Sequence, residues 1–182
     1  MEDLVVKKIC TRSSTRTVNR RNFQPITPEM DNDIDSYLSL PSSLEFVVDI
    51  NGTLILPSDM ELFKPYEWFS DNIINGCLHL ITHDSPQTFA FHTWFIEMLV
   101  NQGYSENVKR QVNRVDRRRT GELFNQKLVF MPVNPGRNHW ALVAINMSEK
   151  TVKYYDSLLW KNQVTLKIEI EKFLITFIYR LF

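Results

Sequence analysis

Apolar and polar residues alternate most clearly after residue 43, and the first sharp pattern there is a hairpin. Residues 46–56, FVVDINGTLIL, form two β-rich halves around Asn51-Gly52. Asn-Gly is a strong hairpin signal because both residues tolerate positive φ. We therefore predict two short antiparallel strands joined at this dipeptide.

Helical patterns follow this hairpin. Ser58-Asp59-Met60-Glu61 has the form of a capping box, which predicts a short helix. Ser70 is a suitable cap for a second helix from Asp71 to about His83, whose apolar face includes Cys77. An aromatic-rich helix is predicted over residues 87–102, ending at Gly103, and a polar, basic helix over 105–119.

After this helix, the spacing of apolar residues changes to the two-residue alternation of β-strands. Three consecutive segments show it: residues 127–133 (KLVFMPV), 138–147 (NHWALVAINM) and 151–157 (TVKYYDS). Residues 164–182 are again predicted to be helical. Helices followed by a run of adjacent strands indicate an α+β fold, with helices packed on a central, mostly antiparallel sheet.

His139 and Asp156 lie on two strands that the short turn MSEK joins. If this turn centres between Ser148 and Glu149, the two residues are diagonal neighbours on one face, about 7–8 Å apart at Cα. A turn shifted by half a residue would place them on opposite faces. Such a carboxylate can orient the imidazole of a general base. A purely structural His–Asp contact is the competing interpretation, and the spacing alone favours it.

Composition and charge narrow the class of protein. The chain has 182 residues, 43% of them hydrophobic, which suffices for one domain with a sizeable core. Its formal net charge is zero, which gives no general reason to expect nucleic acid or an anionic membrane as partner. Two cysteines, Cys10 and Cys77, make no disulfide framework and fit a reducing compartment. We expect an intracellular protein, in the nucleus or cytoplasm, without a membrane span.

The first 42 residues differ from the rest. They are polar and show little periodicity, so we predict a flexible region over residues 1–42 and a domain over 43–182. The Lys7-Lys8 and Arg20-Arg21 pairs are compatible with a nuclear address, although such pairs in a flexible tail are usually solvated charge.

Several segments together resemble one enzyme family. HWALVAINMSEKTVKYYDSL, starting at His139, is similar to the His-Trp and Tyr-Tyr-Asp-Ser signatures of the ubiquitin-like-protein-specific cysteine proteases of the Ulp/SENP type. Residues 68–75, WFSDNIIN, and 89–95, FAFHTWF, resemble further segments of that family in the expected order. The resemblance covers about residues 44–160. It implies a fold of the papain-like cysteine protease type.

The resemblance also implies roles for particular residues. His139 would be the general base and Asp156 its orienting carboxylate. Trp140 and Trp68 resemble aromatic walls that clamp the Gly-Gly tail of a SUMO-like or other ubiquitin-like modifier, and Asp71 resembles a polar residue near the same channel. The implied reaction is hydrolysis after that tail, in a precursor or a conjugate. No cofactor is implied.

The expected nucleophile is missing from the matching position. The family carries it in an Asp-Cys-Gly motif well after the aspartate, but no cysteine follows Asp156 here. Cys10 lies in the basic region, and a helix cysteine such as Cys77 is usually a small buried hydrophobe. Two interpretations remain: a protease fragment with a C-terminally incomplete fold, which we favour, or a catalytically inactive module that binds the modifier. Either way, we expect the isolated chain to be inactive, and as a fragment poorly soluble.

Two further sequence patterns give only weak signals for a binding site. His79 and His83 have a helical metal-ligand spacing, with His92 beyond, but Leu80 stands where a His-Glu-x-x-His motif has glutamate, so we expect no metal site. Residues 109–119 are basic and contain no aromatic side chain, which indicates a solvated face or a patch for an acidic protein surface, and not a nucleic-acid site.

Overall fold

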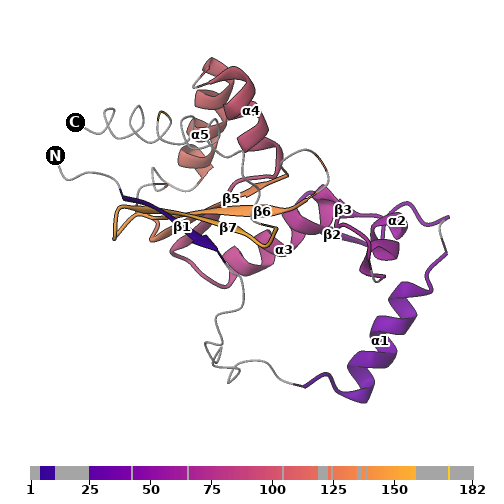
Figure 1. Cartoon of the computed structure of the whole chain (residues 1–182). Helices are drawn as coiled ribbons and strands as arrows, with labels where there is room; N and C mark the ends of the chain where they lie inside the picture. Colours follow the sequence, from indigo (N-terminus) through magenta and orange to yellow (C-terminus); the bar gives the residue numbers. More distant parts are fainter. Residues whose placement is uncertain are drawn as a thin grey trace. The chain divides into compact units, whose positions relative to one another are not determined.

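The chain forms two compact units (Figure 1). The larger comprises Met1–Thr11 and Thr82–Phe182, and the smaller comprises Arg12–Ile81; each is described by itself. The computed structural model describes residues 5–10, 25–41, 43–64, 66–103, 105–118, 123, 125–134, 137, 139–158 and 172, with the backbone alone for 5–10 and 113–118. In these ranges, no helix is both long and apolar enough to cross a membrane.

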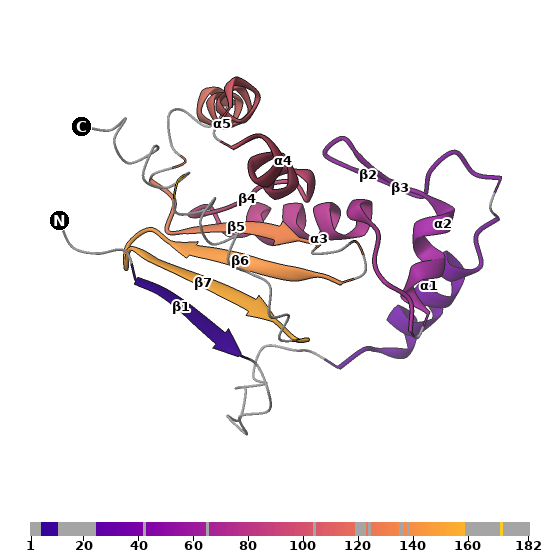
Figure 2. The same cartoon turned by 45° about the horizontal axis from the view of Figure 1, so that its top comes forward.

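A five-stranded sheet organises the larger unit, in the order β1-β7-β6-β5-β4 (Figure 2). Its strands are β1 (Val5–Cys10), β4 (Thr88–Ala90), β5 (Leu128–Val133), β6 (Ala141–Asn146) and β7 (Thr151–Asp156). The three central strands are antiparallel, whereas β1 and β4 run parallel to their neighbours. The predicted α+β class is therefore confirmed, with an antiparallel centre inside a mixed sheet.

The β6–β7 hairpin has one of the two registers that the sequence left open for the MSEK turn. Val143 pairs with Tyr154 and Leu142 with Tyr155, so the turn centres between Ser148 and Glu149. The side-chain oxygen of Asn146 accepts a hydrogen bond from the Glu149 amide at 2.9 Å, which closes the turn. This register brings the start of β6 level with the end of β7.

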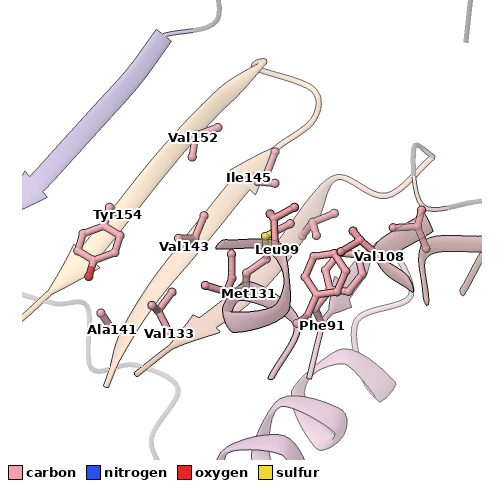
Figure 3. Packing of buried hydrophobic residues seen from close by; sticks show 14 of the residues in the cluster. Phe91, Leu99, Val108, Met131, Val133, Ala141, Val143, Ile145, Val152 and Tyr154 are labelled. Carbon is pink, nitrogen blue, oxygen red and sulfur yellow. The ribbon is translucent and has the colours of Figure 1, made fainter. Parts of the chain in front are cut away.

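Helices α4 (Trp94–Gln102) and α5 (Glu106–Arg118) lie over one face of the sheet (Figure 1). Because side chains alternate between the two faces of a strand, every second residue of β5, β6 and β7 points into this core. Leu99, Val108 and Val112 of the helices are fully buried against them (Figure 3). The strand side chains of the core are Val129, Met131, Val133, Ala141, Val143, Ile145, Val152 and Tyr154.

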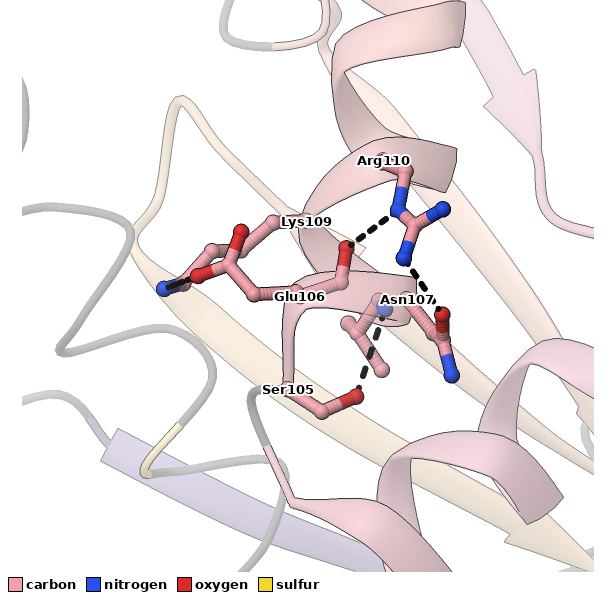
Figure 4. Close-up of polar contacts among 6 residues, drawn as sticks. Ser105, Glu106, Asn107, Lys109 and Arg110 are labelled. Atoms are coloured by element: carbon pink, nitrogen blue, oxygen red, sulfur yellow. Dashed lines mark hydrogen bonds and ion pairs between the residues drawn. The ribbon is translucent and has the colours of Figure 1, made fainter.

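Polar contacts fix the start of α5 (Figure 4). Ser105 Oγ accepts from the Val108 amide at 3.5 Å, as an N-terminal cap does. Lys109 pairs with Glu106, and the Arg110 guanidinium donates to Asn107 at 3.1 Å. These two basic side chains are therefore engaged within their own helix.

One predicted helix is shorter than the sequence pattern indicates. Residues 88–90 form β4, parallel to β5, and the helix α4 begins only at Trp94. Aromatic side chains favour a strand here: Phe91 follows β4 and stacks on Phe95 with ring centroids 3.8 Å apart. The end of α4 agrees with prediction, since Gly103 follows it with a φ of 58°.

The smaller unit holds the predicted Asn-Gly hairpin. Its elements are α1 (Pro28–Leu38), β2 (Val48–Ile50), β3 (Thr53–Ile55), α2 (Pro57–Met60), a 3-10 helix η2 (Glu61–Phe63) and α3 (Asp71–His83), which reaches the unit boundary. Asn51 and Gly52 have φ values of 51° and 85°, as a type I′ turn requires. A Cβ added at Gly76 would lie 3.1 Å from Ile50 Cδ1, so the hairpin packs closely on α3 at this glycine.

One other expectation, the cap at Ser58, is wrong in detail, whereas the flexible region predicted over residues 1–42 is not tested. Helix α2 begins at Pro57, with the Leu56 amide donating to Asp59 Oδ2 at 2.9 Å, so Ser58 is not its cap. The N-terminal region contains two regular elements that its weak periodicity did not reveal: β1, and α1 with its cap Thr27.

Two expectations are not tested by the fold. The domain boundary between residues 42 and 43 stays a prediction. The helix predicted over residues 164–182 lies outside the described residues, apart from Lys172.

We expect Leu99→Ala to lower the free energy of unfolding by about 2 to 5 kcal/mol, because it leaves a cavity under α4. Leu158→Ala is the matched control in the same unit, since Leu158 is 58% exposed, and its effect should stay within about 0.5 kcal/mol. Urea unfolding monitored by circular dichroism measures both. Equal effects of the two substitutions would contradict this assignment of the core.

Candidate active site

His139 and Asp156 meet in a buried hydrogen bond. Nε2 of His139 lies 2.7 Å from Oδ1 of Asp156, and the side chains are 1% and 2% exposed. Asp156 is the last residue of β7, and His139 lies two residues before β6 begins. The two side chains thus meet, as one of the two turn positions considered from the sequence allows; their catalytic roles stay a prediction. An imidazole and a carboxylate held in this way can act as general base and orienting group.

Backbone contacts hold both partners in place. The Leu158 amide donates to Oδ1 of Asp156 at 2.9 Å, so this oxygen accepts two hydrogen bonds. The amide of His139 donates to the side-chain oxygen of Asn134 at 3.2 Å. A buried carboxylate needs such donors, because leaving one unsatisfied away from water is costly. Sequence reasoning missed Asn134, whose only signal is its position directly after β5.

Tyr154 lies on the same face, two residues before Asp156. Its hydroxyl oxygen is buried and has no hydrogen-bond partner within the described part of the chain. Burial, followed by the negative charge of Asp156, raises the pKa of Tyr154 to about 12. The phenol therefore stays protonated well above the range in which an exposed tyrosine ionises.

In the smaller unit, Asp59 organises the segment before α3. Its carboxylate accepts from Ser70 Oγ at 2.5 Å, from Asn72 Nδ2 at 3.0 Å and from the Leu56 amide at 2.9 Å. Burial alone would raise the pKa of Asp59, but these three hydrogen bonds outweigh it and the pKa is lowered. The first turn of α3, which begins at Asp71, is thereby tied to α2. Sequence analysis assigned Asp59 only to a capping pattern and missed this anchoring.

The three residues expected to bind substrate are divided between the units. Trp68, 53% exposed, and Asp71, the exposed first residue of α3, belong to the smaller unit. Trp140, half-buried, follows His139 directly in the larger unit. Their role in clamping a substrate tail stays a prediction.

Neither cysteine has the setting that the sequence indicated. Cys77 is exposed on α3, so the expectation of a buried small hydrophobe is wrong. The buried positions of this helix are Ile73, Gly76 and Thr82, which leaves Cys77 off the packed face. Cys10 ends β1, and its Cα pairs with that of Asp156 in the parallel ladder.

The histidines with metal-ligand spacing have other neighbours. Nδ1 of His79 lies 3.5 Å from Asn51 Nδ2, and Nδ1 of His83 lies 3.1 Å from Asp84 Oδ1. Over the described ranges, no three His, Cys, Asp or Glu side chains are grouped to hold a metal ion.

Comparison with known proteins identifies the family of this chain. Residues 67–178, more than half of the chain, match the Ulp1 protease family, C-terminal catalytic domain. The chain belongs to the Ulp1 protease family. This family comprises cysteine peptidases, in agreement with the resemblance of the His-Trp and Tyr-Tyr-Asp-Ser segments.

Curated relatives of the Ulp1 family support the assignment. A sentrin-specific protease of Caenorhabditis elegans is 30% identical over 153 residues, which cover 73% of this chain and 21% of that protein. Ubiquitin-like-specific protease 1 of Saccharomyces cerevisiae is 26% identical over 157 residues, covering 86% of this chain and 20% of that protein. The chain thus spans about a fifth of the length of these relatives.

Solved structures of Ulp1 share the fold. The SUMO protease Ulp1 with its catalytic cysteine oxidised to a sulfinic acid superposes with a TM-score of 0.72 at 24% identity, covering 84% of this chain and 68% of that one. The C-terminal Ulp1 protease domain in complex with Smt3, the yeast ortholog of SUMO, gives a TM-score of 0.71 at 24% identity, covering 82% and 66%.

We expect Asp59→Ala to destabilise the protein at neutral pH by about 1.5 to 3 kcal/mol, because three donors lose a charged acceptor. Since folding lowers the pKa of Asp59, its contribution is present above the pKa of the unfolded chain and is lost as the pH falls through the folded-state pKa. The difference between wild type and variant in urea unfolding should therefore shrink in acid. Asp33→Ala, at an exposed position of α1, is the control; a gap independent of pH would count against the anchoring role.

We expect Tyr154→Phe to unfold with unchanged or higher free energy near neutral pH, because it removes a buried hydroxyl that lacks a partner. The pKa of Tyr154 is raised in the folded state to about 12. Any stability linked to its protonation is therefore complete below about pH 10 and is lost as the pH rises toward the folded-state value. Tyr154→Phe should consequently show a weaker decline at alkaline pH in thermal melts. A variant that declines as steeply as wild type would refute this.

Proposed function

We propose that this chain carries the general base and the orienting carboxylate of a cysteine peptidase that hydrolyses the bond after the C-terminal Gly-Gly of a ubiquitin-like modifier. Membership of the Ulp1 family supports the reaction class. The buried hydrogen bond between His139 and Asp156 is the observation that carries the assignment of residues. The modifier is of the SUMO type in this proposal, by analogy with the Ulp1 domain solved with Smt3.

The geometry supports different roles for the two nitrogens of the His139 imidazole. Asp156 bonds Nε2 of His139, so Nδ1 is the nitrogen that would take the proton of a thiol. The thiolate attacks the carbonyl carbon of the last glycine, and the imidazolium returns its proton to the departing lysine amine, leaving a thioester that water hydrolyses. Asp156 stabilises the imidazolium and keeps the ring in one tautomer.

The substrate tail is proposed to pass between indole rings. Trp140 is next to the base, and Trp68 is exposed in the segment before α3. A narrow space between such rings admits glycine and excludes any Cβ, so it selects for the absence of a side chain. Asp71 would lie beside the same channel.

The nucleophile is the part that this chain does not supply. No cysteine follows Asp156, and neither Cys10 nor Cys77 stands at a position that matches the family's Asp-Cys-Gly motif. We therefore propose that a segment outside these 182 residues provides it, so that the chain alone does not turn over. The same absence favours one alternative, a catalytically inactive module that binds the modifier. Partners in both cases are the modifier and its conjugates, in the nucleus or cytoplasm.

Extension of the transcript beyond the codon for Phe182 tests the proposal. If an in-frame Gln followed by Asp-Cys-Gly is found, we expect the extended protein to cleave a SUMO-type precursor and the 182-residue chain not to cleave it. A gel shift of the precursor measures the cleavage. In the extended protein, we expect His139→Gln and Asp156→Asn to lower kcat by about 10⁴-fold or more.

His83→Gln is the matched control, because His83 is an exposed histidine and should retain full activity. Full activity of His139→Gln would overturn the assignment of the base. Cleavage by the 182-residue chain would overturn the proposal about the nucleophile. A verified stop codon together with retained binding of the modifier would select the inactive module.

A further inference from the structure

The backbone amide of His139 lies outside the β5–β6 ladder, so no neighbouring strand of the described residues provides its hydrogen-bond acceptor. The last described pair of the β5–β6 ladder joins Val133 to Ala141, and His139 lies in the connection between these strands, two residues before β6 begins. His139 is nevertheless almost completely buried. A buried amide without a strand partner must find another acceptor or it destabilises the connection.

Asn134 supplies that acceptor from the other end of the same connection. Its side-chain Oδ1 lies 3.2 Å from the His139 nitrogen, and its backbone oxygen accepts from the Arg137 amide at 3.2 Å. One residue at the end of β5 therefore closes the connection twice. Arg137 reaches α4 as well, through an ion pair of 3.2 Å with Glu97, but both side chains are largely exposed and such a pair contributes little.

We propose that Asn134 is a positioning residue for the His139–Asp156 pair. Its side-chain oxygen fixes the backbone of His139, and this sets the direction from which the ring reaches Oδ1 of Asp156. The carboxylate is fixed separately by the Leu158 amide. The pair is thus aligned by two local backbone contacts, one for each partner. This inference deepens the proposed function and rests on it for its catalytic meaning.

The consequence concerns the imidazole ring. With its backbone held, the ring donates from Nε2 to Asp156 and keeps a single tautomer, with Nδ1 as the acceptor. Without the Asn134 contact, the connection gains freedom, and the ring loses its fixed direction while β6, β7 and the core stay intact. A residue that served only stability would change the melting temperature without changing the tautomer.

The experiment compares Asn134→Leu, which keeps the volume and removes the acceptor, with Asn134→Asp, which keeps an acceptor. Asn146→Leu is the matched control, because Asn146 lies at the end of the neighbouring strand β6 and its side chain also accepts a backbone hydrogen bond, from Glu149 at 2.9 Å. The first readout is the rate at which diethyl pyrocarbonate modifies His139 in the 182-residue chain, resolved by mass spectrometry against exposed His83. Dilute protein suffices for this measurement.

We expect modification of His139 to be up to about tenfold faster in Asn134→Leu, the factor that corresponds to about 1.4 kcal/mol. Asn134→Asp and Asn146→Leu should react as slowly as wild type. The second readout is the ring nitrogen spectrum of ¹⁵N-labelled protein, assigned with His139→Gln. It should show one tautomer in wild type and a mixture in Asn134→Leu.

An unchanged rate and tautomer in Asn134→Leu, or the same change in Asn146→Leu, would overturn the inference. Should Asn134→Leu fail to fold, Asn134→Ala tests the same loss with a smaller side chain. Neither readout requires cleavage of a modifier. If the protein extended with an in-frame Asp-Cys-Gly cleaves no modifier precursor, while the 182-residue chain shows the expected tautomer change, the proposed function is refuted and the positioning role stands.

Discussion

The register of the β6–β7 hairpin is the constraint on which the candidate site depends. Side chains alternate strictly along a strand, so a shift of one residue would move Asp156 to the opposite face from His139. The five consecutive pairs from Leu142–Tyr155 to Asn146–Thr151 prevent that shift. The same register places Val143, Val152 and Tyr154 in the core under α4 and α5. Packing and chemistry therefore require the same alignment of two strands.

Burial gives the pair its chemical character. His139 and Asp156 are nearly inaccessible to water, and a charge in such a place persists only with close partners. Oδ1 of Asp156 has two donors, one from the ring and one from the backbone of Leu158. Tyr154, by contrast, is buried without a hydrogen-bond partner for its hydroxyl among the described residues. Burial and the charge of Asp156 raise its pKa and keep the hydroxyl protonated.

The proposed functions are divided between the two units. The base and its carboxylate belong to the larger unit, whereas Trp68 and Asp71 belong to the smaller one. Among the described residues, all the exposed large apolar side chains except Trp94 and Leu158 also lie in the smaller unit. Large exposed apolar surfaces usually mark interaction sites, which agrees with a modifier-binding role for the segment that carries Trp68.

Local patterns in the sequence determined the Asn-Gly hairpin, the cap of α3 at Ser70 and the central antiparallel strands, because turn residues and side-chain alternation act over a few neighbours. The MSEK turn left two registers open, and the packed hairpin decided between them. Tertiary structure alone decided that residues 88–90 pair with β5, that β1 adds to the edge at β7, and that Gly76 rather than Cys77 faces the Asn-Gly hairpin. It also decided that Asn134 holds His139 and that Asp59 gathers Ser70 and Asn72. The residues in these contacts are not related by a helical or strand repeat in the sequence, so only the folded chain brings each donor to its acceptor.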